Sequence, residues 1–465
     1  MIEKDRILRL QEIQIENFKN IGKGTVTFPS AENGTFYEGH GEIVGIYGQN
    51  ASGKTSVIEA LSLLQSMLLG ISISSELGHY VNKESTWSRL SFQFYTCYQS
   101  ERLLINYAFT FEKGKKEENG SGRIVGEELK YKNLSAEQSF RTILAYDANL
   151  GKEGLVTERY YRKLIGGEQK NRIKVEVEKQ RAYEEGRSVL FSEGIRTLVD
   201  NNFDDPVVKS VFNSLQFYAR MNMILLTNRD SASATFNILT MQIRHEEGMR
   251  LTRGDFFIPT IEESFNIPEE EYSMFRSIVE QVNLVLQKIV PDLSVRVFEL
   301  GRSLDKDGKQ QVTLEIVSNR KGVEIPFRYE SDGVKKIFLM LNALISVYNN
   351  PSVLAAIDEI DSGVFEFMLG ELLAIMQKGA KGQLIFTSHN LRAMEKLNKE
   401  SIIVSTANPD KRFMRIPNIR GTNNLRDVYL RTVDLGGLNE EIYEPTDRYA
   451  ISHAFRKAGV KHEQK

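Results

Sequence analysis

The segment GQNASGKT, Gly48 to Thr55, constrains the fold of this 465-residue chain more than any other feature. It matches the pattern GxxxxGK[ST], in which a glycine-bounded turn and the start of a helix surround a phosphate with backbone N–H groups. That pattern needs a strand before it and a helix after it. The preceding EIVGIY is apolar on both faces, as in a buried parallel strand, and apolar residues at helical spacing follow the loop. This context argues against a chance match.

The residues of this loop have separate expected roles. Lys54 is expected to reach the β- and γ-phosphates, and Thr55 is expected to ligate Mg²⁺. The helix that follows directs its N-terminal N–H groups and its dipole at the anion. The predicted phosphate-binding residues are Gly48, Gln49, Asn50, Ala51, Ser52, Gly53, Lys54, Thr55 and Ser56.

A second segment, SVLAAIDEID, has the features of the other half of a hydrolytic site. Val353 to Ile357 is apolar, and Asp358 and Glu359 follow directly. In such a site Asp358 holds the Mg²⁺ shell and Glu359 polarises the attacking water. The alternative is an acidic loop after an ordinary buried strand, and the phosphate loop elsewhere in the chain favours the catalytic interpretation.

Two further patterns lie on either side of this acidic strand. GQLIFTSHN reads as a buried strand with His389 just past its end, where a polar residue can sense a γ-phosphate. In YESDGVKKIFLMLNAL, Ser331 and Gly333 open a helix, and such a start is an anion site in principle. The alternatives are a structural histidine and the N-cap of an ordinary helix.

Taken in order, these elements resemble the ATPase head of the ABC superfamily in its RecF/SMC-like branch. The resemblance rests on IQIENFKNIG, the Walker A loop GQNASGKT, the signature-like SDGVKK, the Walker B strand VLAAIDEID and the switch TSHN. It implies an α/β fold, namely a P-loop ABC-type head with an N-terminal antiparallel β subdomain, a parallel-sheet core and an inserted helical domain. The implied cofactors are ATP and Mg²⁺.

The resemblance also implies a head-to-head homodimer with each ATP between two subunits. Ser331 and Gly333 then contact the γ-phosphate held by the partner, and Asp361 matches the D-loop at the interface. Gln93 and Gln99 are the candidates for the Q-loop glutamine. Higher oligomers remain open.

Departures from the family pattern indicate which branch of the superfamily the chain resembles. The signature is not LSGGQ, Ala51 replaces a common glycine, and there is no zinc hook or long coiled-coil arm. IDEIDSGVF with a helical insertion is closest to the OLD-like ATPases of bacterial phage defence. The last residues lack the DxD pair of a TOPRIM nuclease and are similar to those of stand-alone ATPases, such as RloA-like proteins and the ATPase subunit of PARIS systems.

The expected function is therefore a cytoplasmic Mg-dependent ATPase that controls a separately encoded effector, such as a TOPRIM nuclease, in anti-phage defence. A phage protein is the expected trigger. The alternative is a RecF-like DNA-binding ATPase in DNA repair, for which five arginines of the C-terminal tail form the candidate surface. A transporter subunit is disfavoured by the signature and by the length of the insertion. The five arginines are Arg412, Arg415, Arg420, Arg426 and Arg431.

Pattern changes divide the chain into four expected parts. Residues 1–140 form the N-terminal lobe of the head with Walker A, and 141–289 form a helical insertion. Residues 290–410 form the C-terminal lobe with the signature, Walker B and the switch histidine. Residues 411–465 form a tail whose aromatics (Tyr429, Tyr443, Tyr449 and Phe455) favour an ordered structure.

Composition restricts the class of protein. The net charge of -2 provides no global basic field for nucleic acid, so DNA binding is left open. The single cysteine, Cys97, excludes internal disulfides and a CxxC metal site. No apolar run reaches the length of about 18 residues that a transmembrane helix needs, and the charged N-terminus lacks a signal-peptide pattern, so we expect no membrane association.

Overall fold

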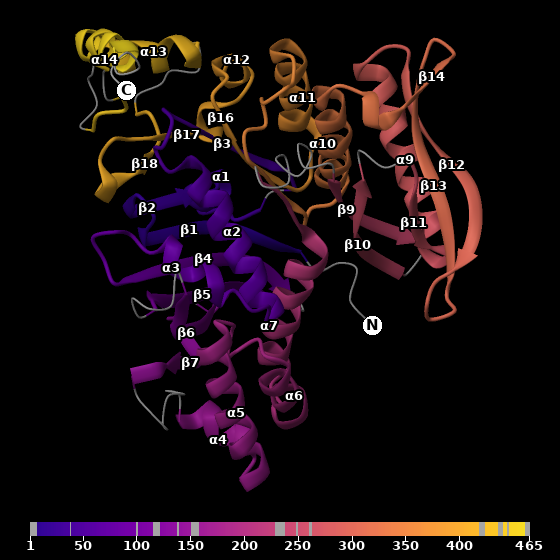
Figure 1. Cartoon of the computed structure of the whole chain (residues 1–465). Helices are drawn as coiled ribbons and strands as arrows, with labels where there is room; N and C mark the ends of the chain where they lie inside the picture. The colour runs from indigo at the N-terminus through magenta and orange to yellow at the C-terminus, as the bar shows by residue number, and fades with distance from the viewer. Residues whose placement is uncertain are drawn as a thin grey trace.

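The structure is a computed structural model of the whole chain (Figure 1). The residues that it describes are 7–37, 39–98, 101–114, 121–136, 139–149, 158–227, 238–247, 250–259, 263–417, 424–435, 440–443 and 446–460.

A six-stranded sheet of order β18-β17-β3-β16-β15-β8 forms the core. All neighbours are parallel except β18, which is antiparallel to β17. Because side chains alternate along a strand, Val44 and Ile46 of β3 face one hydrophobic core, and Ile43 and Tyr47 face the other. Burial on both faces explains the continuous apolar sequence of β3. The strands are β3 (Glu42–Tyr47), β8 (Met223–Leu226), β15 (Leu354–Ile357), β16 (Gln383–Ser388), β17 (Ile402–Ser405) and β18 (Phe413–Met414).

An antiparallel sheet of order β2-β1-β4-β5-β6-β7 lies on one side of this core. Its apolar side chains share a single hydrophobic core with the helix after the phosphate loop and with one face of the parallel sheet. The elements are β1 (Leu8–Phe18), β2 (Ile21–Thr27), β4 (Trp87–Tyr98), β5 (Glu101–Lys113), β6 (Gly122–Asn133), β7 (Arg141–Asp147), α1 (Pro29–Glu32), α2 (Lys54–Leu69) and α3 (Ser74–Tyr80).

Helices and a smaller sheet cover the other face of the core. Helices α10 and α11 contribute to its second hydrophobic core, together with α9 and strands β12 and β13. The smaller sheet lies to one side, next to α9 (Figure 1). The elements are α9 (Glu269–Ile289), α10 (Asp332–Asn349), α11 (Glu366–Gly379), α12 (Leu391–Met394), β11 (Phe265–Pro268), β12 (Leu293–Leu304), β13 (Gln310–Arg320) and β14 (Val323–Pro326).

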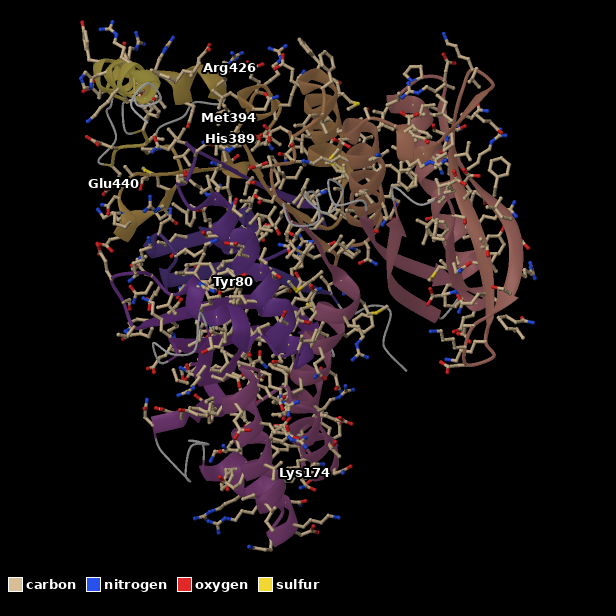
Figure 2. The ribbon with its side chains drawn as sticks, viewed as in Figure 1. Tyr80, Lys174, His389, Met394, Arg426 and Glu440 are labelled. Carbon is tan, nitrogen blue, oxygen red and sulfur yellow. The ribbon has the colours of Figure 1, made fainter. Side chains whose placement is uncertain are left out.

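A group of helices extends away from the two large sheets (Figure 1). Lys174, on α5, lies at their far end, whereas His389 lies at the opposite side of the molecule (Figure 2). A five-residue π-helix, Tyr218–Asn222, connects this group to β8. The remaining elements are α4 (Glu158–Ile165), α5 (Gln169–Glu185), α6 (Glu193–Asn202), α7 (Pro206–Phe217), the hairpin β9 (Ile238–Glu247) and β10 (Arg250–Pro259), α13 (Leu425–Leu435) and α14 (Arg448–Val460).

The expected α/β class, with an antiparallel subdomain and a parallel core, is confirmed. The expected helical insertion over 141–289 needs correction, because β7 extends the antiparallel sheet and β8 is a strand of the parallel core. A four-residue apolar strand such as β8 has no periodicity that separates it from a helix. The boundary before 411 is also displaced, since β18 pairs with β17 inside the core sheet. Within the described ranges, no helix combines the length and apolarity needed to cross a membrane.

A buried ion pair joins the antiparallel sheet to the parallel core. Arg9 of β1 donates from Nη2 to Glu42 Oε2 of β3 at 2.7 Å, and from Nη1 to the Lys381 carbonyl at 2.9 Å. Gln383 of β16 donates to the same Glu42 oxygen at 3.0 Å and exchanges two hydrogen bonds with the backbone of Leu10. Arg9 is 0% exposed and Glu42 is 8% exposed. These contacts fix the position of one sheet relative to the other.

We predict that Arg9→Met lowers the free energy of unfolding by about 3–5 kcal/mol, because it leaves the buried Glu42 carboxylate unpaired. Urea unfolding followed by circular dichroism measures the change. The matched control is Arg276→Met, which removes an exposed ion pair with Glu280 and should cost less than about 1 kcal/mol. Equal effects of the two substitutions would contradict this role for Arg9.

Candidate active site

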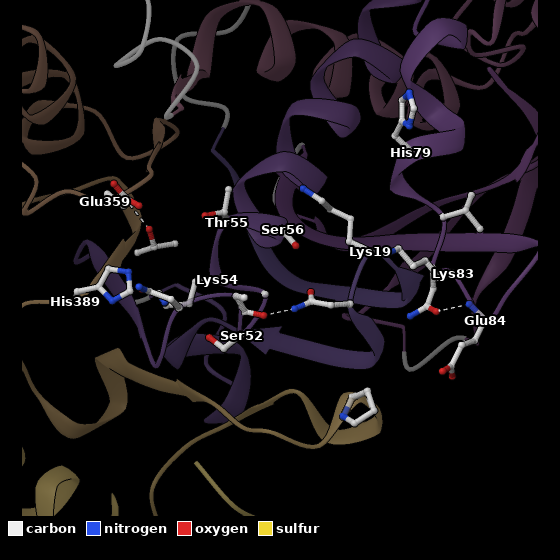
Figure 3. Close-up of a pocket in the computed structure, with 18 residues that line it drawn as sticks. Lys19, Ser52, Lys54, Thr55, Ser56, His79, Lys83, Glu84, Glu359 and His389 are labelled. Carbon is white, nitrogen blue, oxygen red and sulfur yellow. Dashed lines mark hydrogen bonds between the residues drawn. The ribbon is translucent and has the colours of Figure 1, made fainter. Parts of the chain in front are cut away.

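A cavity of about 870 Å³ opens where β3 meets α2 (Figure 3). One part of its wall is the phosphate loop, with Glu359 and His389 nearby. The opposite part carries His79, Lys83 and Glu84. The cavity therefore extends well beyond the loop. Its lining residues are Lys19, Asn20, Asn50, Ala51, Ser52, Gly53, Lys54, Thr55, Ser56, His79, Val81, Asn82, Lys83, Glu84, Glu359, Thr387, His389 and Pro409.

The loop between β3 and α2 has the backbone geometry that its glycines permit. Gly53, the N-cap of α2, has φ 89°, in the left-handed region that glycine tolerates. Gly48 passes so close to Ser405 that a Cβ there would overlap its Oγ, and that hydroxyl also hydrogen-bonds Ser52 Oγ at 2.5 Å. Ala51, the departure from the common glycine, has φ 61° and its carbonyl accepts a bond from Asn20 Nδ2.

Lys54 crosses this loop from the first turn of α2. Its Nζ donates to the carbonyls of Gly48 at 2.9 Å and Gln49 at 2.8 Å. Burial lowers the pKa of Lys54 to about 8, although the carboxylates of Asp358, Glu359 and Asp361 oppose the shift. The ammonium is thus positioned at the phosphate loop. It loses its proton near pH 8.

The carboxylate of Asp358 lies between two threonine hydroxyls. Its Oδ1 accepts hydrogen bonds from Thr55 Oγ1 at 3.1 Å and from Thr387 Oγ1 at 2.6 Å. Its Oδ2 is buried, and no donor among the described residues reaches it. Burial raises the pKa of Asp358, and the two hydroxyls counteract that rise. A hydroxyl beside a carboxylate with an unused oxygen fits Mg²⁺, which prefers oxygen ligands.

Glu359 is held through its backbone. It has φ 46°, a conformation that costs a non-glycine residue roughly 1–2 kcal/mol. Its N–H donates to Thr387 Oγ1 at 2.7 Å, and its carbonyl accepts from Lys336 Nζ at 2.6 Å. The residue lines the cavity. Thr387 therefore positions both acidic residues, since its single hydroxyl accepts from one and donates to the other.

His389 and Asp361 meet next to these residues. The His389 N–H donates to Asp361 Oδ2 at 3.3 Å, and the exposed imidazole lines the cavity (Figure 3). Burial of part of the ring and the charge of Lys54 lower the pKa of His389, so the imidazole is neutral at pH 7. A neutral ring in this place can donate or accept a hydrogen bond.

The signature-like residues lie apart from the cavity. Ser331 is exposed and caps α10 by accepting a hydrogen bond from the Val334 N–H at 3.4 Å. Gly333 packs against the Gly363 carbonyl so closely that a Cβ would overlap it. Neither Ser331 nor Gly333 lines the cavity of this chain. The structure thus shows the helix N-cap, and contact with a nucleotide through a second subunit stays a prediction.

The structure does not place either candidate Q-loop glutamine at the cavity. Gln93 lies within β4, paired with Glu12 and Asn106 across the strands, and does not line the cavity. Gln99 lies outside the described residues. Sequence reasoning did not assign the rim residues Lys19 and Asn20, whose signal is the ENFKNIG hairpin, nor the buried Thr387 and Ser405. The contact of Lys336 with Glu359 was also missed.

Comparisons with known proteins agree with a nucleotide-binding core. A family model described as an AAA domain matches residues 12–182, which include the phosphate loop. No curated protein matches the chain.

Several solved SMC head domains overlay on much of the chain with low similarity. One is a head bound to the C-terminal winged-helix domain of ScpA, with 13% identity, TM-score 0.44 and coverage of 88% of this chain and 97% of that chain. The head from Pyrococcus furiosus has 12% identity, TM-score 0.41 and coverage of 92% and 100%. The head from Thermotoga maritima has 11% identity, TM-score 0.37 and coverage of 88% and 100%. These values are too low to transfer a function to this chain.

We predict that ATP affinity falls about tenfold between pH 7 and pH 9, because the empty protein loses the Lys54 proton near pH 8 and binding then requires its return. Calorimetry with a non-hydrolysable ATP analogue should also detect proton uptake above pH 8. The control Lys54→Arg keeps its charge across this range and should flatten the profile. An unchanged profile in that variant would assign the pH dependence to another group.

Proposed function

We propose that this chain is a Mg-dependent ATPase of the ABC type that closes as a head-to-head homodimer around ATP and controls a separately encoded effector. The observation that carries the ATPase part is the shared hydroxyl of Thr387, which holds Asp358 and Glu359 beside Thr55. This arrangement combines a phosphate loop, a metal-binding pair and a carboxylate at one cavity.

Each residue of this site has a role that its geometry supports. Thr55 and Asp358 would hold Mg²⁺, which supplies neutralisation of phosphate charge when it is bound. Lys54 and the N-terminus of α2 bind the phosphates. Glu359 orients and deprotonates the attacking water, and the neutral imidazole of His389 hydrogen-bonds the terminal phosphate.

Several observations support the homodimer. The N-cap of α10, Ser331, is exposed to solvent and Gly333 adjoins the Gly363 turn, which follows Asp361. Phe365, two residues after Gly363, is 67% exposed. Its ring contacts that of Phe367, which is 52% exposed. An exposed helix start beside exposed aromatics fits a surface that a second copy covers.

We predict that Glu359→Gln binds ATP but cleaves it about 10²–10⁴-fold more slowly, because the water loses its base. In the presence of ATP and Mg²⁺ this variant should remain a dimer in light scattering. Lys54→Ala should bind no ATP and remain a monomer under the same conditions. Cleavage at the wild-type rate by Glu359→Gln would show that another residue is the base.

The effector part of the proposal, in bacterial anti-phage defence with a phage protein as trigger, rests on the resemblance to OLD-like stand-alone ATPases. One surface supports a protein partner: Tyr449 and Phe455 of α14 are 89% and 77% exposed. Tyr429 of α13, in contrast, is only 8% exposed. Exposed aromatics on one short helix fit the anchors of an interface.

The structure weakens the case for DNA binding by the arginines of the tail. Arg412 is buried and donates to the carbonyls of Thr406 and Asn20. Arg415 and Arg426 pair with carboxylates of the chain itself (Figure 2 shows Arg426), and Arg420 lies outside the described residues. DNA-stimulated, salt-dependent hydrolysis remains the result that would favour the RecF-like alternative.

We predict that the product of an adjacent gene, a nuclease or toxin, co-purifies with the wild-type chain and is lost from the double variant Tyr449→Ser with Phe455→Ser. That variant should keep ATP-dependent dimerisation, because α14 lies apart from the cavity. Affinity purification followed by mass spectrometry measures both. Recovery of no effector by the wild-type chain, with a gene neighbourhood lacking any nuclease or toxin, would contradict the effector role.

A further inference from the structure

One lysine of the signature-like helix contacts the proposed catalytic glutamate of the same chain. Lys336 lies one turn after Ser331 in α10, and its Nζ donates to the backbone carbonyl of Glu359 at 2.6 Å. The ammonium also faces the carboxylates of Asp358, Glu359 and Asp361, which favour its charge against the effect of burial. The contact connects two parts of the fold that are 23 residues apart in sequence.

The contact acts on a strained part of the backbone. Glu359 has a left-handed φ of 46°, and such a conformation persists only where the surroundings fix it. The Thr387 hydroxyl holds the N–H of Glu359, and the Glu359 carbonyl accepts from Lys336 Nζ at 2.6 Å and from the Ser362 N–H at 3.0 Å. The Ser362 bond lies within the acidic turn itself, whereas Lys336 reaches the carbonyl from α10. Removal of Lys336 leaves this carbonyl with the bond from its own turn and without the bond from α10.

A second contact joins α10 to the acidic turn. At the first turn of α10, Gly333 packs directly on the Gly363 carbonyl. The neighbouring Lys335 is oriented differently, because its Nζ donates to the Arg328 carbonyl at 2.9 Å. Of these two neighbouring lysines of α10, Lys336 is thus the one that contacts Glu359.

We propose that Lys336 is a positioning residue that ties the start of the signature-like helix to the catalytic glutamate of its own chain. The proposal rests on the head-to-head dimer. In that dimer Ser331 contacts the nucleotide held by the partner, whereas Glu359 acts on the nucleotide held by its own loop. Lys336 therefore couples the two composite sites, because occupation of one site sets the position of the base at the other.

Steady-state kinetics test the positioning role. Lys336→Met should lower kcat by about 10- to 100-fold, the size expected when a reacting group is misplaced, with ATP affinity unchanged within twofold. Lys336→Arg retains a donor and should recover most of the rate. Lys335→Met is the matched control, since it removes a lysine-to-carbonyl bond from the same helix and should leave kcat within about twofold. Equal loss in both methionine variants would reduce Lys336 to a structural role.

Mixed dimers in a single turnover test whether Lys336 acts within its own chain. The first dimer combines a Lys336→Met chain with a Glu359→Gln chain, so each site has one impaired base. The second combines a wild-type chain with a chain carrying both substitutions, so one site is intact. We expect fast cleavage of half of the bound ATP in the second dimer and of none in the first.

The mixed-dimer experiment distinguishes failure of the Lys336 role from failure of the proposed function. Fast cleavage of half of the ATP by the first dimer would overturn the role of Lys336, because its loss would then not affect the glutamate of its own chain. The wild-type homodimer is measured alongside. Absence of ATP cleavage there, or absence of dimer, would instead contradict the proposed function on which this inference rests.

Discussion

The parallel alignment of β3, β16 and β15 is the constraint on which the rest of the site depends. Parallel strands end at the same edge of a sheet, so the loop after β3, the end of β16 and the end of β15 meet there. The register pairs Ile357 with Phe386, which brings Asp358 beside Thr387. A hydroxyl at that point can then hold two acidic residues and leave one carboxylate oxygen unused.

The antiparallel sheet contributes the outer wall of the cavity. Lys19 and Asn20 lie in the turn between β1 and β2, and Lys83 lies before β4. Their distance from the phosphate loop depends on how the two large sheets pack, to which the buried pair of Arg9 and Glu42 and the shared hydrophobic core both contribute. Removing one partner of the pair leaves a buried charge unpaired. The same network therefore influences the shape of the nucleotide site.

The parts of the site that could be predicted are those with a local sequence signal. The loop at Lys54, and the acidic pair at Asp358, each combine a strand with specific residues directly after it, so their context can be checked in the sequence. Strands β7 and β8 could not be recognised in the same way, because their assignment depends on which distant strand they join. Short apolar segments are assigned by tertiary contacts and not by periodicity.

Contacts between distant segments could not be predicted from the sequence, because they too depend on tertiary packing. Thr387 and Lys336 reach Glu359 only after the strands and α10 have packed, and nothing in their local sequence marks that role. The aromatic residues of the tail favoured an ordered structure, and α13 and α14 form there. The aromatics of α14 are nevertheless exposed, since a composition rule does not say which surface an aromatic covers.

The central claim is that each ATP site is built from two chains, and complementation tests it most directly. A Lys54→Ala chain lacks the phosphate-binding half, and a Ser331→Arg chain lacks the signature half, so each should be inactive alone. Mixed, they form dimers in which one of the two sites has both halves intact, and ATP hydrolysis should return, at a rate lowered by loss of the coupling from the empty second site. Failure of the mixture to recover activity, with both chains folded and present as mixed dimers, would contradict the composite site.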